Sequence, residues 1–432
     1  MEIYEILVLV LTFLFLLSLG VPISFSIGIS SLLTMMLSIN SVPSFTTVAQ
    51  RMATGIDSFA LLAIPFFILA GQLMNHGGIA RRLIDFAKIL VGKLPGGLAF
   101  VNIMAAMLFG AISGSAVAAA SAIGGFMTPV MEKEGYDKSF SAAVNITSAT
   151  TGMIIPPSNI LIVYSLASGG VSIAALFLAG YIPGILLGLS LMIVAGFHAK
   201  KHKYKVSIDF TFGYAVKKFL DAIPSLLLII IVIGGIVAGY FTATEASAVA
   251  VLYALILSVI IYKEVKLRDL PKILLNSSAT TAIVMLLVGT SMAMSWVMAY
   301  ENIPQTVAET LIALSNNKIV ILMIINLVLL FVGVFMDMTP AVLIFTPIFL
   351  PVAIQLGIDP IHFGIVMVMN LSIGLCTPPV GSVLFVGCSV ANLPITKVIR
   401  PLIPMFIAMI ITLLFVTYLP VLSLYIPQFF GY

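Results

Sequence analysis

The chain has 432 residues, of which 61% are hydrophobic and only 8% are charged. Soluble globular chains carry about a quarter charged residues, so the composition excludes a soluble enzyme or binding domain and indicates a polytopic helical membrane protein. The formal net charge is +4, and much of the basic excess lies in a few short loops. It therefore bears on membrane orientation and not on nucleic-acid binding.

The first half of the chain, residues 1–205, contains a complete set of elements. Its first apolar run, 6–19, lacks a basic leader and continues into a second span, so we expect no cleavable signal peptide. Three predicted spans are followed by an amphipathic stretch at 79–94, typical of a helix lying at the membrane interface. A helical hairpin at about 98–130, a proline-broken helix at 139–168 and a last span complete this half.

The second half repeats this order after a hydrophilic segment, 206–221, which we predict to be a cytoplasmic linker. Residues 222–432 contain three spans, an amphipathic stretch at 303–315, a hairpin at about 318–356, a broken helix at 361–392 and a last span. We therefore predict an all-α polytopic membrane protein with two repeats, about ten spans and two re-entrant hairpins.

The two halves align without a gap over one long segment. Setting Pro129 against Pro351 gives an offset of 222 residues. Glycine, aspartate and proline positions then coincide, pairing Gly135 with Gly357, Asp137 with Asp359, Gly152 with Gly374 and Pro156-Pro157 with Pro378-Pro379. Apolar residues match by chance in such a composition, but these residues do not, so we infer a duplication.

Loop charges indicate that the second copy is inverted. After the second span the first copy has the loop SVPSFTTVAQ, whereas the second has the basic KEVKLRDLPK. After the third span the first copy carries Arg81 and Arg82, whereas the second carries Glu301 and Glu309. Because basic loops favour the cytoplasm, equivalent loops lie on opposite faces and both termini are expected outside. Inverted repeats are an architecture of secondary transporters.

Pro156-Pro157 interrupts the broken helix of the first copy. Proline has no N–H, so the carbonyls of Gly152 and Met153 lose their helical partners, and the second copy frees those of Gly374 and Leu375 in the same way. Such carbonyls persist at membrane depth only inside protein or in a polar cavity. They suit a hard cation such as Na⁺. A proline kink of purely structural use is the alternative.

The half-helix after each break begins with free N–H groups and the positive end of a dipole, which suit a carboxylate. In the first copy Ser158 and Asn159 add side-chain partners at this point. The break is therefore a candidate site for an anion as well as for a cation.

The hairpins turn at polar tips. The first turns at Ser113-Gly114-Ser115, among small residues that permit close helix packing. In the second, Thr339 before Pro340 predicts a helix N-cap followed by proline at the first helical position. Asp337 is the only carboxylate deep within an apolar run of either hairpin, and an intramembrane acid is a functional candidate. Capping of the hairpin's second helix is its alternative role.

Long motifs in both halves resemble the large membrane subunit of TRAP (tripartite ATP-independent periplasmic) transporters. They include GAISGSAVAAASAIG, EGYDKSFSAAV and TGMIIPPSNILIVY in the first half, and GVFMDMTPA, NLSIGLCTPPVGSVLFV and YFTATEASAVAVLYAL in the second. The resemblance implies a bacterial inner-membrane importer of organic acids, coupled to Na⁺, in which a scaffold holds an elevator-like transport domain. It also implies two partners, a small four-helix membrane subunit, expected as a separate chain, and a periplasmic binding protein that delivers the substrate.

Carried over by position, the resemblance implies two or more Na⁺ ions at the hairpin tips and breaks, and no organic cofactor. The residues expected to bind Na⁺ are Ser113, Gly114, Ser115, Gly152, Met153, Pro156, Asp337, Gly374, Leu375, Thr377 and Pro378. Those expected to contact the substrate are Ser115, Ser158, Asn159, Asp337 and Thr339.

Several functions remain open from the sequence. Sialic acid and C4-dicarboxylates are the substrate classes considered, and PPSN followed by IVYSLASGG is somewhat more similar to the sialic-acid branch. A stand-alone Na⁺/organic-anion symporter without a binding protein is the alternative within transport. An intramembrane hydrolase using Ser113 or Ser115 needs a histidine at membrane depth, where none is predicted, so we expect no enzyme. A structural subunit without a site is disfavoured by the paired breaks.

Overall fold

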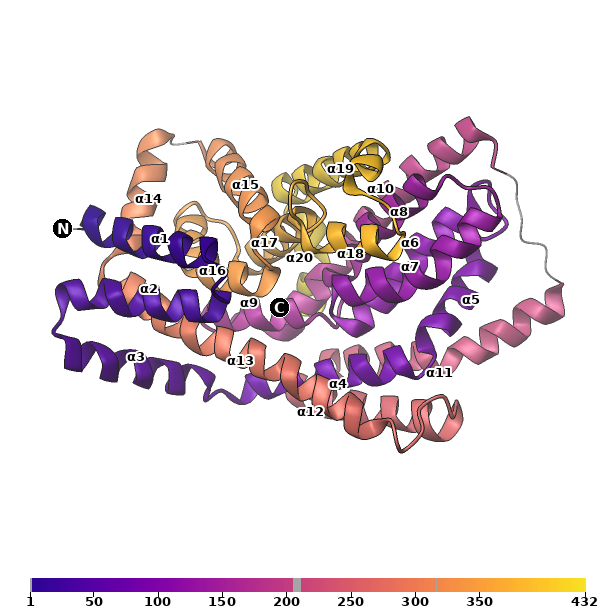
Figure 1. Ribbon diagram of the computed structural model, residues 1–432, viewed down its shortest axis with the longest axis horizontal. Helices are drawn as coiled ribbons and strands as arrows, with labels where there is room; N and C mark the ends of the chain where they lie inside the picture. The colour runs from indigo at the N-terminus through magenta and orange to yellow at the C-terminus, as the bar shows by residue number, and fades with distance from the viewer. Residues whose placement is uncertain (1, 205–210, 316) are drawn as a thin grey trace.

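The computed structural model describes residues 2–204, 211–315 and 317–432, and within them every regular element is a helix (Figure 1). Eight of the described helices are long and apolar enough to cross a membrane, and α1 and α2 are shorter apolar helices. The predicted all-α polytopic fold is confirmed.

The first half runs from α1 to α10. Its elements are α1 (Glu2–Ser18), α2 (Ile23–Ser38), α3 (Ser41–Ile56), the 3₁₀ turn η1 (Phe59–Leu62), α4 (Ala63–His76), α5 (Ile79–Val91), α6 (Gly97–Ser113), α7 (Ala116–Lys133), α8 (Lys138–Ala149), the 3₁₀ turn η2 (Thr151–Met153), α9 (Asn159–Ala167) and α10 (Ile173–His202). Here α6 and α7 form the hairpin, and α8 and α9 are the two parts of the broken helix.

The second half has the same order. Its elements are α11 (Phe212–Val237), α12 (Ala243–Leu255) with the π-helical segment η3 (Ile256–Ile261), α13 (Leu270–Tyr300), α14 (Ile303–Leu314), α15 (Lys318–Phe335), α16 (Met338–Gln355), α17 (Pro360–Gly374), α18 (Ser382–Val390), α19 (Ile395–Tyr418) and α20 (Val421–Phe429). Here α15 and α16 form the hairpin, and α17 and α18 form the broken helix.

Positions 222 residues apart have the same local structure. Gly135 and Gly357 both take a left-handed conformation, with φ of 81° and 69°. The next helix in each copy is capped by an aspartate, since Asp137 accepts a hydrogen bond from the backbone N–H of Phe140 and Asp359 from that of Ile361. The Pro-Pro peptide bond is cis in both breaks. The matching glycine conformations and aspartate caps support the inferred duplication.

The helices form two groups that meet along the middle of the molecule. In Figure 1, α3, α4, α12 and α13 lie together on one side, where α3 and α4 pack on α13 and α4 packs on α12. The other group contains the hairpins and broken helices together with α10 and α19. The amphipathic helices connect the groups, because α5 packs on α6 and α14 packs on α16. Any site between the hairpin tips therefore has a wall from each group.

The sequence predictions differ from the structure in two segments. The stretch SVPSFTTVAQ, expected as a loop, forms most of α3, and its face packs on α13. The linker predicted at 206–221 overlaps a helix, since residues from Phe212 onward are the first turns of α11, while 205–210 lie outside the described residues. Both segments have low hydrophobicity, which does not distinguish an amphipathic helix from a loop.

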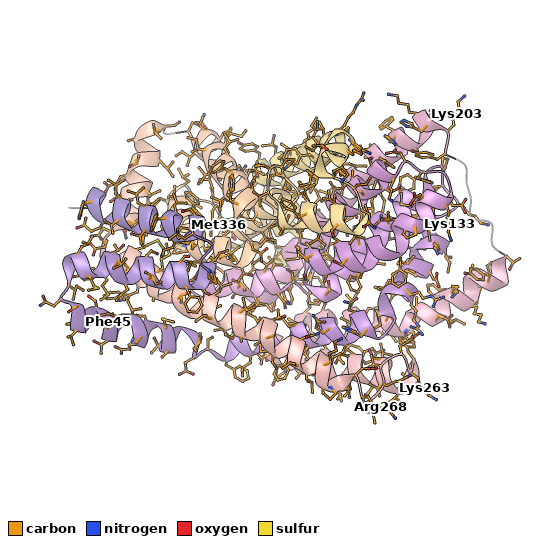
Figure 2. The ribbon with its side chains drawn as sticks, viewed as in Figure 1. Phe45, Lys133, Lys203, Lys263, Arg268 and Met336 are labelled. Atoms are coloured by element: carbon orange, nitrogen blue, oxygen red, sulfur yellow. The ribbon has the colours of Figure 1, made fainter. Side chains whose placement is uncertain are left out.

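Four basic side chains lie towards the same end of the molecule. Lys133, Lys203, Lys263 and Arg268 lie on the side opposite Phe45 (Figure 2). The orientation in which that end faces the cytoplasm stays a prediction.

Each hairpin touches the break of its own copy through a pair of glycines. A Cβ atom added at Gly110 on α6 would lie 2.7 Å from the Cα of Gly152, and one added at Gly374 would lie 2.5 Å from the Cα of Gly333 on α15. Since real Cβ atoms do not approach so closely, the backbones meet only because both residues are glycine. The two contacts hold the breaks against the hairpins.

We expect Gly110→Ala to destabilise the protein, because the new methyl group meets backbone that cannot move aside. Overpacking of this kind costs about 1–3 kcal/mol. Gly125→Ala is the matched control, since Gly125 is exposed on α7 and a Cβ there meets no atom within 4 Å. Thermal unfolding in detergent measures both. Equal melting temperatures for the two variants would contradict the glycine contact.

Candidate functional site

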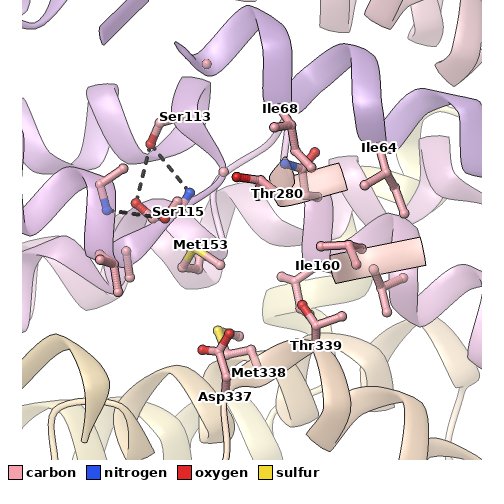
Figure 3. Close-up of a pocket in the computed structure, with 18 of the residues that line it drawn as sticks. Ile64, Ile68, Ser113, Ser115, Met153, Ile160, Thr280, Asp337, Met338 and Thr339 are labelled. Atoms are coloured by element: carbon pink, nitrogen blue, oxygen red, sulfur yellow. Dashed lines mark hydrogen bonds between the residues drawn. The ribbon is translucent and has the colours of Figure 1, made fainter. Parts of the chain in front are cut away.

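A cavity of about 380 Å³ lies where the two hairpin tips, the two breaks and the scaffold meet. Figure 3 shows Ser113, Ser115 and Met153 on one side of it, and Asp337, Met338 and Thr339 on the other. The cavity is lined by Ile64, Ile68, Gly71, Gln72, Asn75, Ser113, Gly114, Ser115, Ala116, Val117, Ala118, Met153, Asn159, Ile160, Val163, Thr280, Val284, Asp337, Met338, Thr339 and Leu375. It contains one carboxylate and otherwise hydroxyl, amide and apolar groups.

The first tip is shaped by a left-handed glycine. Gly114, with φ of 60°, ends α6, and Ser115 caps α7 by accepting a hydrogen bond of 3.2 Å from the N–H of Ala118. A Cβ at Gly114 would lie 2.8 Å from Nδ2 of Asn159, so the tip touches the start of α9. The Ser115 hydroxyl keeps its proton and a second lone pair for another partner.

The second tip differs from the sequence prediction. The N-cap of α16 is Asp337 and not Thr339, which lies inside the helix. The Asp337 carboxylate makes no capping hydrogen bond and is exposed on the cavity wall. Asp337 therefore occupies the N-cap position of the second hairpin helix, as its alternative role predicts, but its side chain does not cap that helix.

In the first break, the Met153 carbonyl that the prolines deprive of a helical donor has another hydrogen-bond partner. The Met153 carbonyl accepts a hydrogen bond of 2.5 Å from the Ser158 hydroxyl, and Ser158 is only 1% exposed. Ser158 is thus part of the break and does not line the cavity, whereas Asn159, the first residue of α9, does. Gly152 faces Gly110 instead.

The carbonyls of the second break also have partners. That of Gly374 accepts a bond of 2.9 Å from the N–H of Thr377, and that of Leu375 accepts one of 3.3 Å from Leu384. The Thr377 hydroxyl donates to the carbonyl of Ile373 at 2.9 Å. Each carbonyl has a second lone pair, so these bonds reduce its capacity to bind a cation without removing it.

The structure brings together only part of the predicted site. The predicted residues that line the cavity are Ser113, Gly114, Ser115, Met153, Asn159, Asp337, Thr339 and Leu375. Those that do not line it are Gly152, Pro156, Ser158, Gly374, Thr377 and Pro378. Among the described residues no three His, Cys, Asp or Glu side chains form a metal-binding group. A cation here would be bound by hydroxyl and carbonyl oxygens with Asp337, which suits a hard ion of low charge.

The sequence predictions missed the scaffold wall. Gln72 and Asn75 on α4 and Thr280 on α13 line the cavity. A Cβ at Gly71 would lie 3.1 Å from the Ser113 carbonyl, so α4 approaches the first tip closely. Two amides three residues apart in a predicted span were a usable signal, because polar residues within a span favour a cavity.

Almost the whole chain matches a described protein family. A family model for the tripartite ATP-independent periplasmic transporter, DctM component, covers residues 10–422. The chain belongs to this family. Members of this family are permeases for solute uptake and not enzymes, and so is this chain. The family implies a binding protein and a small membrane subunit as partners.

Three relatives align over almost their full length. An uncharacterized protein of Salmonella typhimurium, YgiK, is 57% identical, over 99% of this chain and 98% of that protein. The C4-dicarboxylate TRAP transporter large permease of Rhodobacter capsulatus is 39% identical, over 95% and 96%. The sialic acid TRAP transporter large permease of Vibrio cholerae is 40% identical, over 96% of each chain.

The fold of the DctM chain also occurs in a distant solved structure. The Alcanivorax borkumensis YdaH transporter superposes with a TM-score of 0.65 over 91% of this chain and 90% of that one, at 14% identity. This likeness concerns the fold alone. The two relatives with named substrates are almost equally similar to this chain, so identity does not distinguish sialic acid from C4-dicarboxylates.

We expect Ser158→Ala to lower the stability of the protein and Asn159→Ala to lower its solute uptake. Ser158→Ala leaves the buried Met153 carbonyl without its hydroxyl partner, which costs about 1–3 kcal/mol of stability. Asn159→Ala changes the cavity wall, so it lowers solute uptake while stability stays within about 0.5 kcal/mol. Thermal unfolding and uptake are measured on both. A stable Ser158→Ala protein beside an unstable Asn159→Ala protein would reverse the two roles.

Proposed function

We propose that this DctM chain catalyses Na⁺-coupled uptake of an organic acid of the sialic acid or C4-dicarboxylate type. A periplasmic binding protein delivers the acid, and a small four-helix subunit in a separate chain completes the membrane part. The observation that carries the proposal is the single cavity lined by both hairpin tips, by residues of both breaks and by α4 and α13.

The two tips suit opposite charges. The first residues of α7, from Ala116 to Ala118, line the cavity beside Ser115, and Asn159 opens α9 next to them. Helix starts of this kind favour a carboxylate. On the other wall, Asp337 would repel an anion and favours a cation. A substrate carboxylate therefore lies towards the first tip, together with a Na⁺ ion bound by the Ser115 hydroxyl, and a further Na⁺ ion lies at Asp337 in the second tip.

This arrangement explains coupling. Without a cation, the Asp337 carboxylate faces a cavity that also has to admit an anion, and the repulsion opposes substrate binding. A Na⁺ ion at Asp337 removes that repulsion, so the ion raises substrate affinity. By linkage the substrate raises Na⁺ affinity by the same factor.

An elevator movement fits the two walls. Hairpins and broken helices supply one wall of the cavity, and α4 with α13 supply the other. If the first group slides along the second, the tips carry the bound acid and Na⁺ across the membrane. The amphipathic helices α5 and α14, which pack on α6 and α16, would guide the movement.

Asp337→Asn and Ser115→Ala are expected to weaken Na⁺ dependence. Loss of the carboxylate or hydroxyl removes a cation ligand, so the Na⁺ concentration for half-maximal uptake rises roughly tenfold or more, equivalent to about 1.4 kcal/mol. Asp57→Asn, at the exposed end of α3, and Ser121→Ala, on the exposed face of α7, are the matched controls. Na⁺ titration curves identical to the parent in both cavity variants would refute the assignment.

The binding protein is expected to be indispensable. In proteoliposomes that contain this chain and the small subunit, uptake of labelled sialic acid or succinate should follow only when the periplasmic binding protein is added. Which of the two acids is taken up decides the substrate class. Uptake at full rate without any binding protein would favour a stand-alone Na⁺/organic-anion symporter instead.

A further inference from the structure

A second cavity, of about 550 Å³, separates the N-terminal helix from the second hairpin. One wall comes from α1, α13 and α14, and the other from α15 and α16. Every residue that lines this apolar groove is aliphatic, methionine or phenylalanine. Leu14, Phe331 and Phe335 on its rim are 53%, 67% and 53% exposed, so the groove opens sideways to the surroundings of the helices. In a membrane those surroundings are lipid hydrocarbon.

The groove is as long as one leaflet. It follows α1 from Ile6 to Leu17, which at about 1.5 Å per residue is about 16 Å. The hydrocarbon core of a bilayer is about 30 Å thick, so each leaflet contributes about half of that. The inner end lies at Met336, next to Asp337 at the hairpin tip.

A buried carboxylate lies at the outer end. Glu5 is 6% exposed and lies one helical turn before Leu9, on the same buried face of α1 as Leu9 and Phe13. Its Oε2 has no hydrogen-bond partner in the part of the chain that the structure describes. An unpaired buried carboxylate is costly unless a donor or a cation compensates it.

The symmetry-related pair of helices is in direct contact. There α11, the equivalent of α1, packs directly on α5. Phe86 and Phe219 are in ring contact at 5.9 Å, and Lys218 forms an ion pair of 2.7 Å with Asp85. By contrast, α1 of the first copy and α14 of the second copy lie on the wall of the groove, so this space is a particular feature of one end of the protein.

We propose that the apolar groove binds one acyl chain of a bilayer phospholipid with a primary-amine headgroup, such as phosphatidylethanolamine. The chain runs along α1 towards Met336, and the ammonium donates a hydrogen bond to Glu5. A choline headgroup has no N–H and cannot supply this bond. A membrane-spanning helix of a partner is a poor occupant, because it needs about 20 residues and the groove is one leaflet long.

The lipid has a consequence for the hairpin. The chain fills the space between α1 and α15, so it lies between the scaffold and the element that carries Asp337. Removal of the lipid exposes an apolar surface on both walls, which favours their direct contact. Lipid composition then changes the position of the second tip without any contact between lipid and substrate.

The test uses tryptophan fluorescence of the complex with its small subunit. The chain has a single tryptophan, Trp296, which packs with α2 and α3 away from the groove, and Trp296→Phe removes it. Phe335→Trp then places a reporter in the groove, and Phe415→Trp places a control on the exposed face of α19. Phosphatidylethanolamine with brominated acyl chains is titrated into delipidated complex in detergent. We expect saturable quenching near one lipid per chain for the Phe335→Trp reporter, and weak, non-saturating quenching for the control.

Further variants separate the acyl chain from the headgroup. Val10→Phe narrows the groove and should abolish the saturable phase. Glu5→Gln should weaken binding of phosphatidylethanolamine about tenfold and leave brominated phosphatidylcholine unchanged. Size-exclusion chromatography checks that each variant assembles. Equal quenching of both reporters, or saturable quenching that survives Val10→Phe, overturns the proposal. Efficient cross-linking of Leu14→Cys to the small subunit also overturns it, because the groove would then be a protein interface.

Discussion

Every backbone N–H and C=O at membrane depth needs a partner, and the whole site depends on how the two breaks meet this requirement. Proline removes the helical donors, and the chain replaces them locally. The Ser158 hydroxyl satisfies the Met153 carbonyl, and the N–H groups of Thr377 and Leu384 satisfy the second break. The breaks are consequently ordered structures, held against the hairpins by glycine contacts, and their residues can line a cavity in a fixed geometry.

The two copies share the same hairpins and breaks, but the residues at the two hairpin tips differ. Ser115 and Asp337 occupy equivalent positions, each as the N-cap of the second hairpin helix. Ser115 uses its side chain to cap the helix, whereas the Asp337 carboxylate remains available in the cavity. A symmetric pair of serines would leave the cavity neutral, and a symmetric pair of aspartates would repel an organic acid. One of each fits the proposed binding of an organic acid together with Na⁺.

The sequence was sufficient for the fold because its signals are long and repeated. Hydrophobic runs, the register of Gly135 with Gly357 and the paired prolines locate the hairpins and broken helices to within a few residues. The site was predicted less well, because its details depend on contacts between distant segments. The positions of the prolines show which carbonyls lose a helical N–H donor, but they cannot show that the Ser158 hydroxyl replaces one of these donors. The role of α4 likewise depends on a tertiary contact between Gly71 and the first tip.

The two ends of the broken helices show how far the copies have separated. In the first copy the Asp137 cap is covered by an aromatic cluster, in which Tyr136 stacks on Tyr204 and the Tyr204 hydroxyl accepts a hydrogen bond from the Asp137 N–H. At the equivalent place in the second copy, beside Asp359, there is a cavity of about 330 Å³. Beneath it His362 bonds to Ser423 and to the Thr417 carbonyl. Stacked aromatic side chains thus cover the helix cap in the first copy, whereas a cavity with hydrogen-bonded His362 lies beside the cap in the second. An inverted repeat whose two ends faced identical surroundings would have no reason to diverge in this way, whereas a permease meets a different compartment at each end.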